Sequence, residues 1–174
     1  KNGTMALLCA SLLNRNITVL KNVPQIEEVY RIIEVLSSIG MSVKWKERDV
    51  HIKPGKINLS NIDEAAAGKT RSIIMLIGPL IHKLKKFSIS HSGGCTLGSR
   101  TVRPHFYAME NLGVNIKTTK KKYLIESKKL VPNEIVMYES GDTATENAIM
   151  AASLIPGKTT IKYASANYQV QELC

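Results

Sequence analysis

The spacing of apolar residues predicts helices and strands in an order that repeats along the chain. In residues 24–40, isoleucine, valine and leucine fall at three- and four-residue intervals, which is the period of an amphipathic helix. Gly40 supplies a left-handed helix cap. An apolar helix over residues 2–13 and a strand over 16–23 come before this helix, and a pair of strands over 41–53 follows it.

The same order returns about 72 residues later, which is a spacing typical of an internal structural repeat. The second copy has a helix, a strand, a helix ending at Gly113 and two strands, predicted at residues 70–84, 87–91, 104–113, 114–118 and 123–126. The third copy has a strand, a helix, a strand and the start of a further helix at Gln169, with the first three predicted at residues 134–139, 143–155 and 159–163.

These repeats predict one α/β domain over residues 1–174, with approximate units at 1–60, 61–130 and 131–174. The third copy stops inside its second helix, before the Gly-capped end that the first two copies have. A truncated repeat leaves apolar surface uncovered. We therefore expect the chain to be part of a longer polypeptide.

Composition narrows the class of protein. An apolar content of 44% suits a globular domain, and no apolar run approaches the length of a membrane span. Three cysteines without metal-like spacing suit a reducing compartment, so we expect a cytoplasmic protein. The net charge of +10 favours an anionic partner. Aromatic residues make up 5% of the chain and do not interleave with the basic runs, so nucleic acid is not an expected partner. The short apolar runs make a membrane an unexpected partner as well.

A glycine-rich segment, residues 92–100, carries the clearest candidate chemistry. It joins a predicted strand to a predicted helix and brings Cys95 together with glycines, hydroxyl side chains and Arg100. Glycine allows a ligand to approach the backbone, and nearby cations lower the pKa of a thiol. We predict that Cys95 is a nucleophile or proton carrier, against the alternative of a buried structural cysteine. Cys9, on the apolar face of its helix, is predicted to be a packing residue.

Two further basic positions are candidates for binding an anion. Arg71 opens an apolar helix, where a cation opposes the helix dipole and suits an anion held at the same N-terminus. Lys1 and Asn2 lie at the mouth of the first helix, where the alternative is an exposed chain end. His105, in the first turn of its helix, is expected to be a surface residue.

With these features in hand, the chain resembles the enolpyruvyl transferases, in the branch that acts on UDP-N-acetylglucosamine. The cysteine loop distinguishes that branch from the shikimate-pathway enolpyruvyl transferases, which lack it. The motifs that carry the resemblance are Lys1-Asn2, Asn22-Val23-Pro24, Thr70-Arg71-Ser72, the loop from Gly93 to Arg100, and Ala144-Thr145-Glu146-Asn147.

The resemblance implies an inside-out α/β barrel domain of βαβαββ units, with helices inside and sheets outside. It also implies transfer of the enolpyruvyl group of phosphoenolpyruvate to the 3-hydroxyl of UDP-N-acetylglucosamine with release of phosphate, the committed step of peptidoglycan synthesis. No metal or organic cofactor is implied. The family enzyme has a second catalytic domain, which would be absent from this chain, so the chain alone is expected to be inactive.

The resemblance also implies roles for individual residues. Cys95 matches the catalytic acid or nucleophile. Positions that match the phosphoenolpyruvate site are Lys1, Asn2, Cys95 and Arg100. Positions that match the UDP-sugar site are Arg71, Arg100, Thr101, Val102, Arg103, Pro104, Gly141 and Asp142.

Two nucleotide-contacting segments depart from the family pattern. After Arg100 the family commonly continues Pro-Val-Asp-Leu-His, where this chain has Thr101-Val102-Arg103-Pro104-His105, so that Arg103 replaces a carboxylate. Gly141-Asp142-Thr143 stands where the family has Ser-Val-Gly or Ser-Val-Thr. Two alternatives therefore remain: an enolpyruvyl transferase with another acceptor, and a non-catalytic module on the same fold that binds an anion or a protein.

Overall fold

The computed structural model describes residues 2–91 and 101–174. Its first unit begins with α1 (Asn2–Ala10) and a 3-10 turn, η1 (Ser11–Leu13). β1 (Thr18–Leu20), α2 (Glu27–Ser38), β2 (Ser42–Lys46) and β3 (Asp49–Lys53) follow. The three strands form a sheet in the order β1-β3-β2, in which both neighbours of β3 run antiparallel to it.

The second unit repeats this arrangement. After η2 (Leu59–Asn61), α3 (Glu64–Gly68), η3 (Arg71–Leu76) and α4 (Ile77–Leu80) come β4 (Lys86–Ser90), α5 (Arg103–Asn111), β5 (Val114–Thr118) and β6 (Lys122–Ser127). These strands form a second antiparallel sheet, β4-β6-β5, so the strand order of the first unit recurs. In the third unit, β7 (Glu134–Val136) and β8 (Thr160–Lys162) pair in parallel, with α6 (Asp142–Ala152) between them and α7 (Tyr168–Leu173) after them.

The ends of the second helices show that the first two units are built alike. Gly40 (φ 111°) and Gly113 (φ 90°) both adopt the left-handed conformation that the sequence predicted. A Cβ at Gly40 would collide with the carbonyl oxygen of Lys56, and a Cβ at Gly113 would collide with that of Lys129, the same number of residues further along the chain. Only glycine fits such a position. In each unit this glycine packs against the segment that follows the last strand of the unit.

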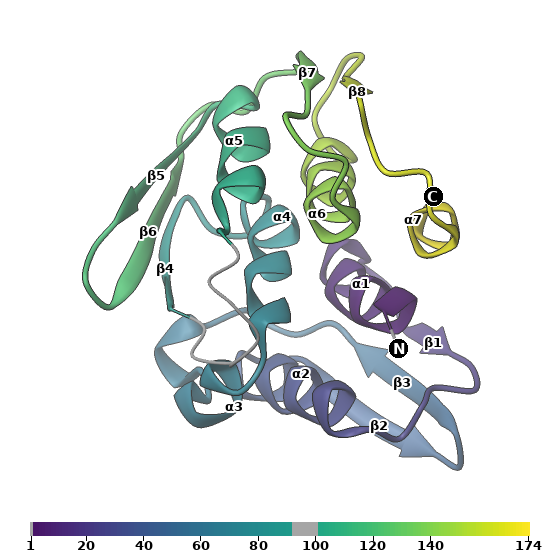
Figure 1. Cartoon of the computed structure of the whole chain (residues 1–174). Coiled ribbons are helices and arrows are strands. Elements are labelled where there is room, and N and C mark those ends of the chain that lie inside the picture. Colours follow the sequence, from purple (N-terminus) through teal and green to yellow (C-terminus); the bar gives the residue numbers. More distant parts are fainter. Residues whose placement is uncertain (1, 92–100) are drawn as a thin grey trace.

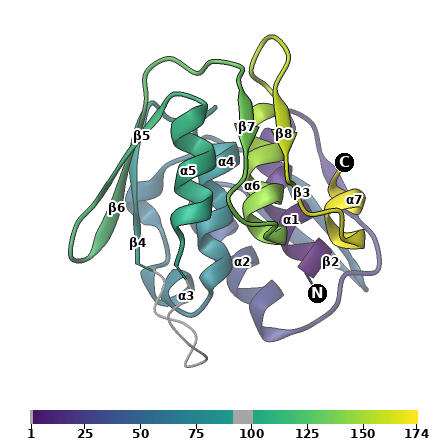
Figure 2. The same cartoon turned by 45° about the horizontal axis from the view of Figure 1, so that its top comes forward.

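The sheets lie on the outside and the helices inside, as predicted (Figure 1). α1, α4 and α6, one from each unit, lie at the centre, with α2 and α5 between them and the sheets (Figures 1 and 2). Their inward side chains are fully buried and apolar, for example Leu8, Ile32, Leu80 and Met150. None of the described helices has the length and apolar character needed to cross a bilayer.

One predicted helix is wrong in its form. Residues 70–84 do not make a continuous α-helix but a 3-10 segment, η3, followed by the single turn of α4. Pro79 has no N–H to donate, and the N–H of Gly78 donates to the side chain of Asn147 on α6 at 2.8 Å instead of to a helical carbonyl. The helix is therefore broken where α6 packs against it.

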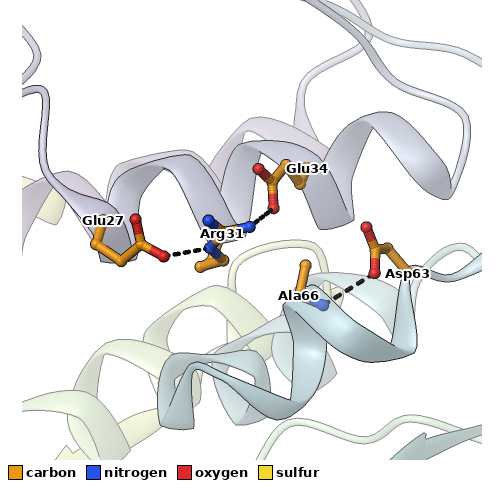
Figure 3. A network of polar contacts seen from close by, with 5 residues as sticks. All are labelled: Glu27, Arg31, Glu34, Asp63 and Ala66. Atoms are coloured by element: carbon orange, nitrogen blue, oxygen red, sulfur yellow. Dashed lines mark hydrogen bonds and ion pairs between the residues drawn. The ribbon is translucent and has the colours of Figure 1, made fainter.

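The short helix α3 was not predicted from the sequence. It begins at a side-chain cap and lies beside α2 (Figure 3). The N–H of Ala66 donates to Oδ1 of Asp63 at 2.9 Å, which caps the helix N-terminus. Beside it, Arg31 of α2 donates to Glu27 and Glu34 at 2.7 and 2.6 Å along the helix surface (Figure 3). These ion pairs lie on a partly exposed side of α2, and the candidate site lies elsewhere.

Candidate functional site

A cavity of about 890 Å³ opens where the three units meet. Asn2 of α1, Arg71 of η3 and Gln169 of α7 come to it from different units, and they meet the N-terminal ends of α5 and α6. Its remaining lining residues are Ser72, Ile74, Met75, Thr101, Pro104, His105, Glu139, Ser140, Gly141, Asp142, Thr143 and Ala144. Helix N-termini and a guanidinium at one cavity suit an anionic ligand.

The structure gathers six of the predicted site residues in this lining: Asn2, Arg71, Thr101, Pro104, Gly141 and Asp142. Val102 and Arg103 are not among the lining residues. The guanidinium of Arg103 instead makes a two-pronged ion pair with Glu110 of the same helix, at 2.8 and 2.7 Å. Lys1, Cys95 and Arg100 lie outside the described residues.

Among the described residues that line the cavity, Arg71 carries the positive charge. Its Nη2 donates to the carbonyl oxygen of Thr101 at 3.1 Å, which ties η3 to the segment that leads into α5. Within residues 2–91 and 101–174, no carboxylate lies within ion-pairing distance of this guanidinium. A half-buried arginine with no internal counter-ion retains donors for a phosphate or carboxylate of a ligand.

His105 lines the cavity but is buried, with 5% of its surface exposed, so the expectation of a surface histidine was wrong. Nδ2 of Asn147 lies 3.2 Å from His105 Nδ1, and Thr143 Oγ1 lies 3.4 Å from His105 Nε2. Because the amide nitrogen can only donate, Nδ1 accepts and Nε2 carries the proton. Burial, and then the charge of Arg71, lower the pKa of His105 to about 4, so the imidazole is neutral at physiological pH.

Asn147 itself joins three elements through one buried amide. Its Oδ1 accepts from the N–H of Gly78 at 2.8 Å, and its Nδ2 donates to the carbonyl of Ile74 at 3.1 Å as well as to His105. It therefore fixes η3, α4 and α5 against α6. Sequence reasoning had included Asn147 in a family motif but had given it no role.

Asp142 begins α6 and holds the connection between β8 and α7. Its Oδ1 accepts from Nδ2 of Asn167 at 2.8 Å and from Oγ of Ser165, and its Oδ2 accepts from Nε2 of Gln169 at 2.6 Å. The carboxylate is thus surrounded by donors from the protein. Gln169 was seen in the sequence only as a helix start, since nothing local showed that its amide would meet Asp142.

Glu146, one turn further along α6, is a buried carboxyl whose two oxygens have no hydrogen-bond partner among the described residues. Burial, and then the charge of Asp142, raise its pKa from 4.5 to about 7. Cys9 is fully buried, as predicted for a packing cysteine, and burial followed by the charge of Glu146 raises the pKa of its thiol. No three His, Cys, Asp or Glu side chains gather as a metal site in the described part of the chain.

Comparison with known proteins finds a family profile and relatives that match the whole sequence of the chain. The profile of the family described as EPSP synthase (3-phosphoshikimate 1-carboxyvinyltransferase) matches residues 1–174. Proteins named UDP-N-acetylglucosamine 1-carboxyvinyltransferase are 36% identical in Treponema denticola, 33% in Borreliella burgdorferi and 30% in Campylobacter jejuni, each over the whole of this chain. The chain spans 41% of the length of these curated relatives.

Solved structures agree on the fold. The enolpyruvyl transferase NikO from Streptomyces tendae superposes with a TM-score of 0.85 at 14% identity, covering 99% of this chain and 41% of that one. An EPSP synthase from Acinetobacter baumannii gives a TM-score of 0.72 at 14% identity, covering 98% and 40%. Together with the profile match over every residue, these likenesses show that the chain belongs to the EPSP synthase family of carboxyvinyl transferases.

Proposed function

We propose that the protein containing this chain transfers the enolpyruvyl group of phosphoenolpyruvate to the 3-hydroxyl of UDP-N-acetylglucosamine and releases phosphate. The observation that carries this proposal is the run of relatives with that name, at 30–36% identity over the whole chain. This reaction would make the protein a cytoplasmic enzyme of peptidoglycan synthesis, with a second catalytic domain in the same polypeptide.

The cavity suits two anionic substrates. Arg71 has a fork of donors and no described internal counter-ion, and the N-termini of α5 and α6 point partial positive charge at the same space. The net charge of +10 would draw phosphoenolpyruvate and a sugar nucleotide toward the protein. We propose that Arg71, Thr101, Pro104, Gly141 and Asp142 form the wall that faces the UDP-sugar.

We further propose that Cys95 is the acid or nucleophile and that Lys1, Asn2 and Arg100 bind phosphoenolpyruvate. Asn2 lines the cavity. Thr101, directly after Arg100 in sequence, lines it as well and accepts the hydrogen bond from Arg71. Both observations support a phosphoenolpyruvate site next to the described cavity.

The test is phosphate release by the full-length protein with both substrates present. We expect release to need both phosphoenolpyruvate and UDP-N-acetylglucosamine and to fall by at least a hundredfold in Cys95→Ala, because loss of a positioned acid or nucleophile removes that much rate. Cys174→Ala is the matched control, since Cys174 is exposed and distant in sequence from the loop. Equal rates in the two variants would refute the role of Cys95.

A second candidate is an enolpyruvyl transferase with a different acceptor. The observation that favours it is Arg103, which stands where the family has a carboxylate and is held by Glu110 outside the cavity lining. Phosphate release that depends on phosphoenolpyruvate and another hydroxyl acceptor, but not on UDP-N-acetylglucosamine, would establish this candidate. Phosphate release that saturates with rising UDP-N-acetylglucosamine concentration would exclude this second candidate.

A further inference from the structure

A series of hydrogen-bonded side chains links the start of α6 to the start of α7 and the start of α7 to the start of α1. Asp142 Oδ2 accepts from Nε2 of Gln169 at 2.6 Å, and Oε1 of Gln169 accepts from Nδ2 of Asn2 at 3.5 Å. All three residues line the cavity. Residues far apart in sequence are thus joined at the site, and Figures 1 and 2 show α1 and α7 side by side.

The direction of these hydrogen bonds is fixed at one end. A carboxylate can only accept, so the amide of Gln169 must turn its Nε2 toward Asp142. Its Oε1 then faces Asn2, and Asn2 must meet it with Nδ2. The Oδ1 of Asn2 is left as an acceptor that no other described residue fills. The charge of Asp142 therefore sets the polarity of an amide at the cavity.

The surrounding structure holds this series of side chains in place. Gln169 is 4% exposed, and Asp142 also binds Ser165 and Asn167 of the segment that leads into α7. The N–H of Ser165 donates to Oγ1 of Thr145 at 3.0 Å, which anchors the same segment to α6 a second time. The carboxyl group of Glu172 of α7 lies against Gly3 of α1, so the two helices are in contact beside these three residues.

We propose that Gln169 is a positioning residue which, locked by Asp142, orients the amide of Asn2 so that its Oδ1 accepts a hydrogen bond from a hydroxyl donor of the substrate. This inference rests on the proposed function and adds a second contact to Asn2, which lies at the proposed phosphoenolpyruvate site: the donor to its Oδ1 is then a hydroxyl of the acceptor sugar. The contact of 3.5 Å between Gln169 and Asn2 is long, and hydrogen bonds of an active site commonly shorten when substrate binds.

The test uses the full-length protein and a double-mutant cycle. We expect Gln169→Ala to lower kcat/KM roughly tenfold, because one oriented hydrogen bond is lost. The same change made in an Asn2→Ala background should cost less than about twofold, since Gln169 then has nothing to orient. Gln171→Ala is the matched control: it is exposed on the same helix, donates to the backbone of Ala166 and should keep the wild-type rate.

Gln169→Glu provides a second variant of unchanged shape. Ionised, this side chain cannot donate to Asp142, and protonated it can, so its rate relative to wild type should rise as the pH falls from 8 to 6. Besides Asp142, the carboxyl groups near this series of side chains are Glu139, which lines the cavity, Glu146, one turn along α6, and Glu172 on α7. Wild type carries all of them, so the ratio isolates position 169.

The outcomes separate the two proposals. If wild type releases no phosphate with the two substrates, the proposed function fails and the assigned role of Gln169 fails with it. If wild type is active and Gln169→Ala matches Gln171→Ala, only the positioning role fails. Equal costs of Gln169→Ala with and without Asn2 would also overturn it, because they would show a structural effect that does not pass through Asn2.

Discussion

Replacement of Asn147 by alanine tests whether one buried amide holds the cavity together. The variant removes three hydrogen bonds, with Gly78 N–H at 2.8 Å, the Ile74 carbonyl at 3.1 Å and His105 Nδ1 at 3.2 Å. All three partners belong to elements packed against α6, and Asn147 itself is fully buried. Loss of the amide leaves the N–H of Gly78 and Nδ1 of His105 without this partner at a buried position, while the carbonyl of Ile74 still accepts from the N–H of Ile77.

The expected loss in the free energy of unfolding follows from the number of hydrogen bonds removed. A typical intramolecular hydrogen bond contributes about 1 kcal/mol, and a buried partner left unsatisfied costs more. The better helix propensity of alanine returns about 0.5 kcal/mol. We expect Asn147→Ala to lower the free energy of unfolding by about 3 kcal/mol, which for a chain of this size lowers the Tm by about 10 °C.

The assay is urea unfolding of this chain, followed by far-ultraviolet circular dichroism and by the fluorescence of Trp45, its single tryptophan. Asn111→Ala is the matched control, because the side-chain amide of Asn111 makes one half-buried hydrogen bond, to the carbonyl of Tyr107 at 2.8 Å. Its expected cost is about 1 kcal/mol. An Asn147→Ala cost no greater than that of Asn111→Ala would refute the reasoning.

Two further predictions concern stability. The pKa of Glu146 is raised from 4.5 to about 7, so its protonated form stabilises the fold below pH 4.5 and this contribution is lost as the pH rises through 7. Unfolding curves of Glu146→Gln and wild type should therefore diverge in favour of the variant, by up to about 3 kcal/mol between pH 5 and pH 9, and a difference independent of pH would contradict this. Gly113→Ala should lower the free energy of unfolding by about 1–3 kcal/mol, because φ is 90° and the Cβ would meet the carbonyl of Lys129. Gly68→Ala, where a Cβ meets nothing within 4 Å, should change it by less than about 0.5 kcal/mol in a parallel melt, and equal costs for the two variants would show that the cap is unstrained.

The repeated fold could be predicted because its signals are local. The helical period before Gly40 and Gly113, the glycine at each helix end and the strand pairs after them lie within short windows. Each of the first two units can therefore be recognised from its own stretch of sequence. Pro79 is a local signal of the break between η3 and α4, whereas the contact of Gly78 with the side chain of Asn147 comes from a distant part of the chain and could not be predicted.

The candidate site was predictable only in part, for the same reason. Arg71 and Asn2 could be selected because a cation or a polar pair at a helix start is unusual locally, and both line the cavity. The burial of His105 and the contacts of Gln169 depend on how the units pack, and no nearby residue signals either. Arg103 was chosen by its position in a motif, while its own helix supplies Glu110 as its partner.

The central claim is that the cavity between the units binds a sugar nucleotide through Arg71. Calorimetric titration of UDP-N-acetylglucosamine into the full-length protein and its Arg71→Ala variant tests it most directly. We predict saturable binding to wild type and at least tenfold weaker binding to the variant, because a charge-assisted contact to a phosphate is lost. No binding to wild type at millimolar UDP-N-acetylglucosamine, or equal affinity for both proteins, would contradict it.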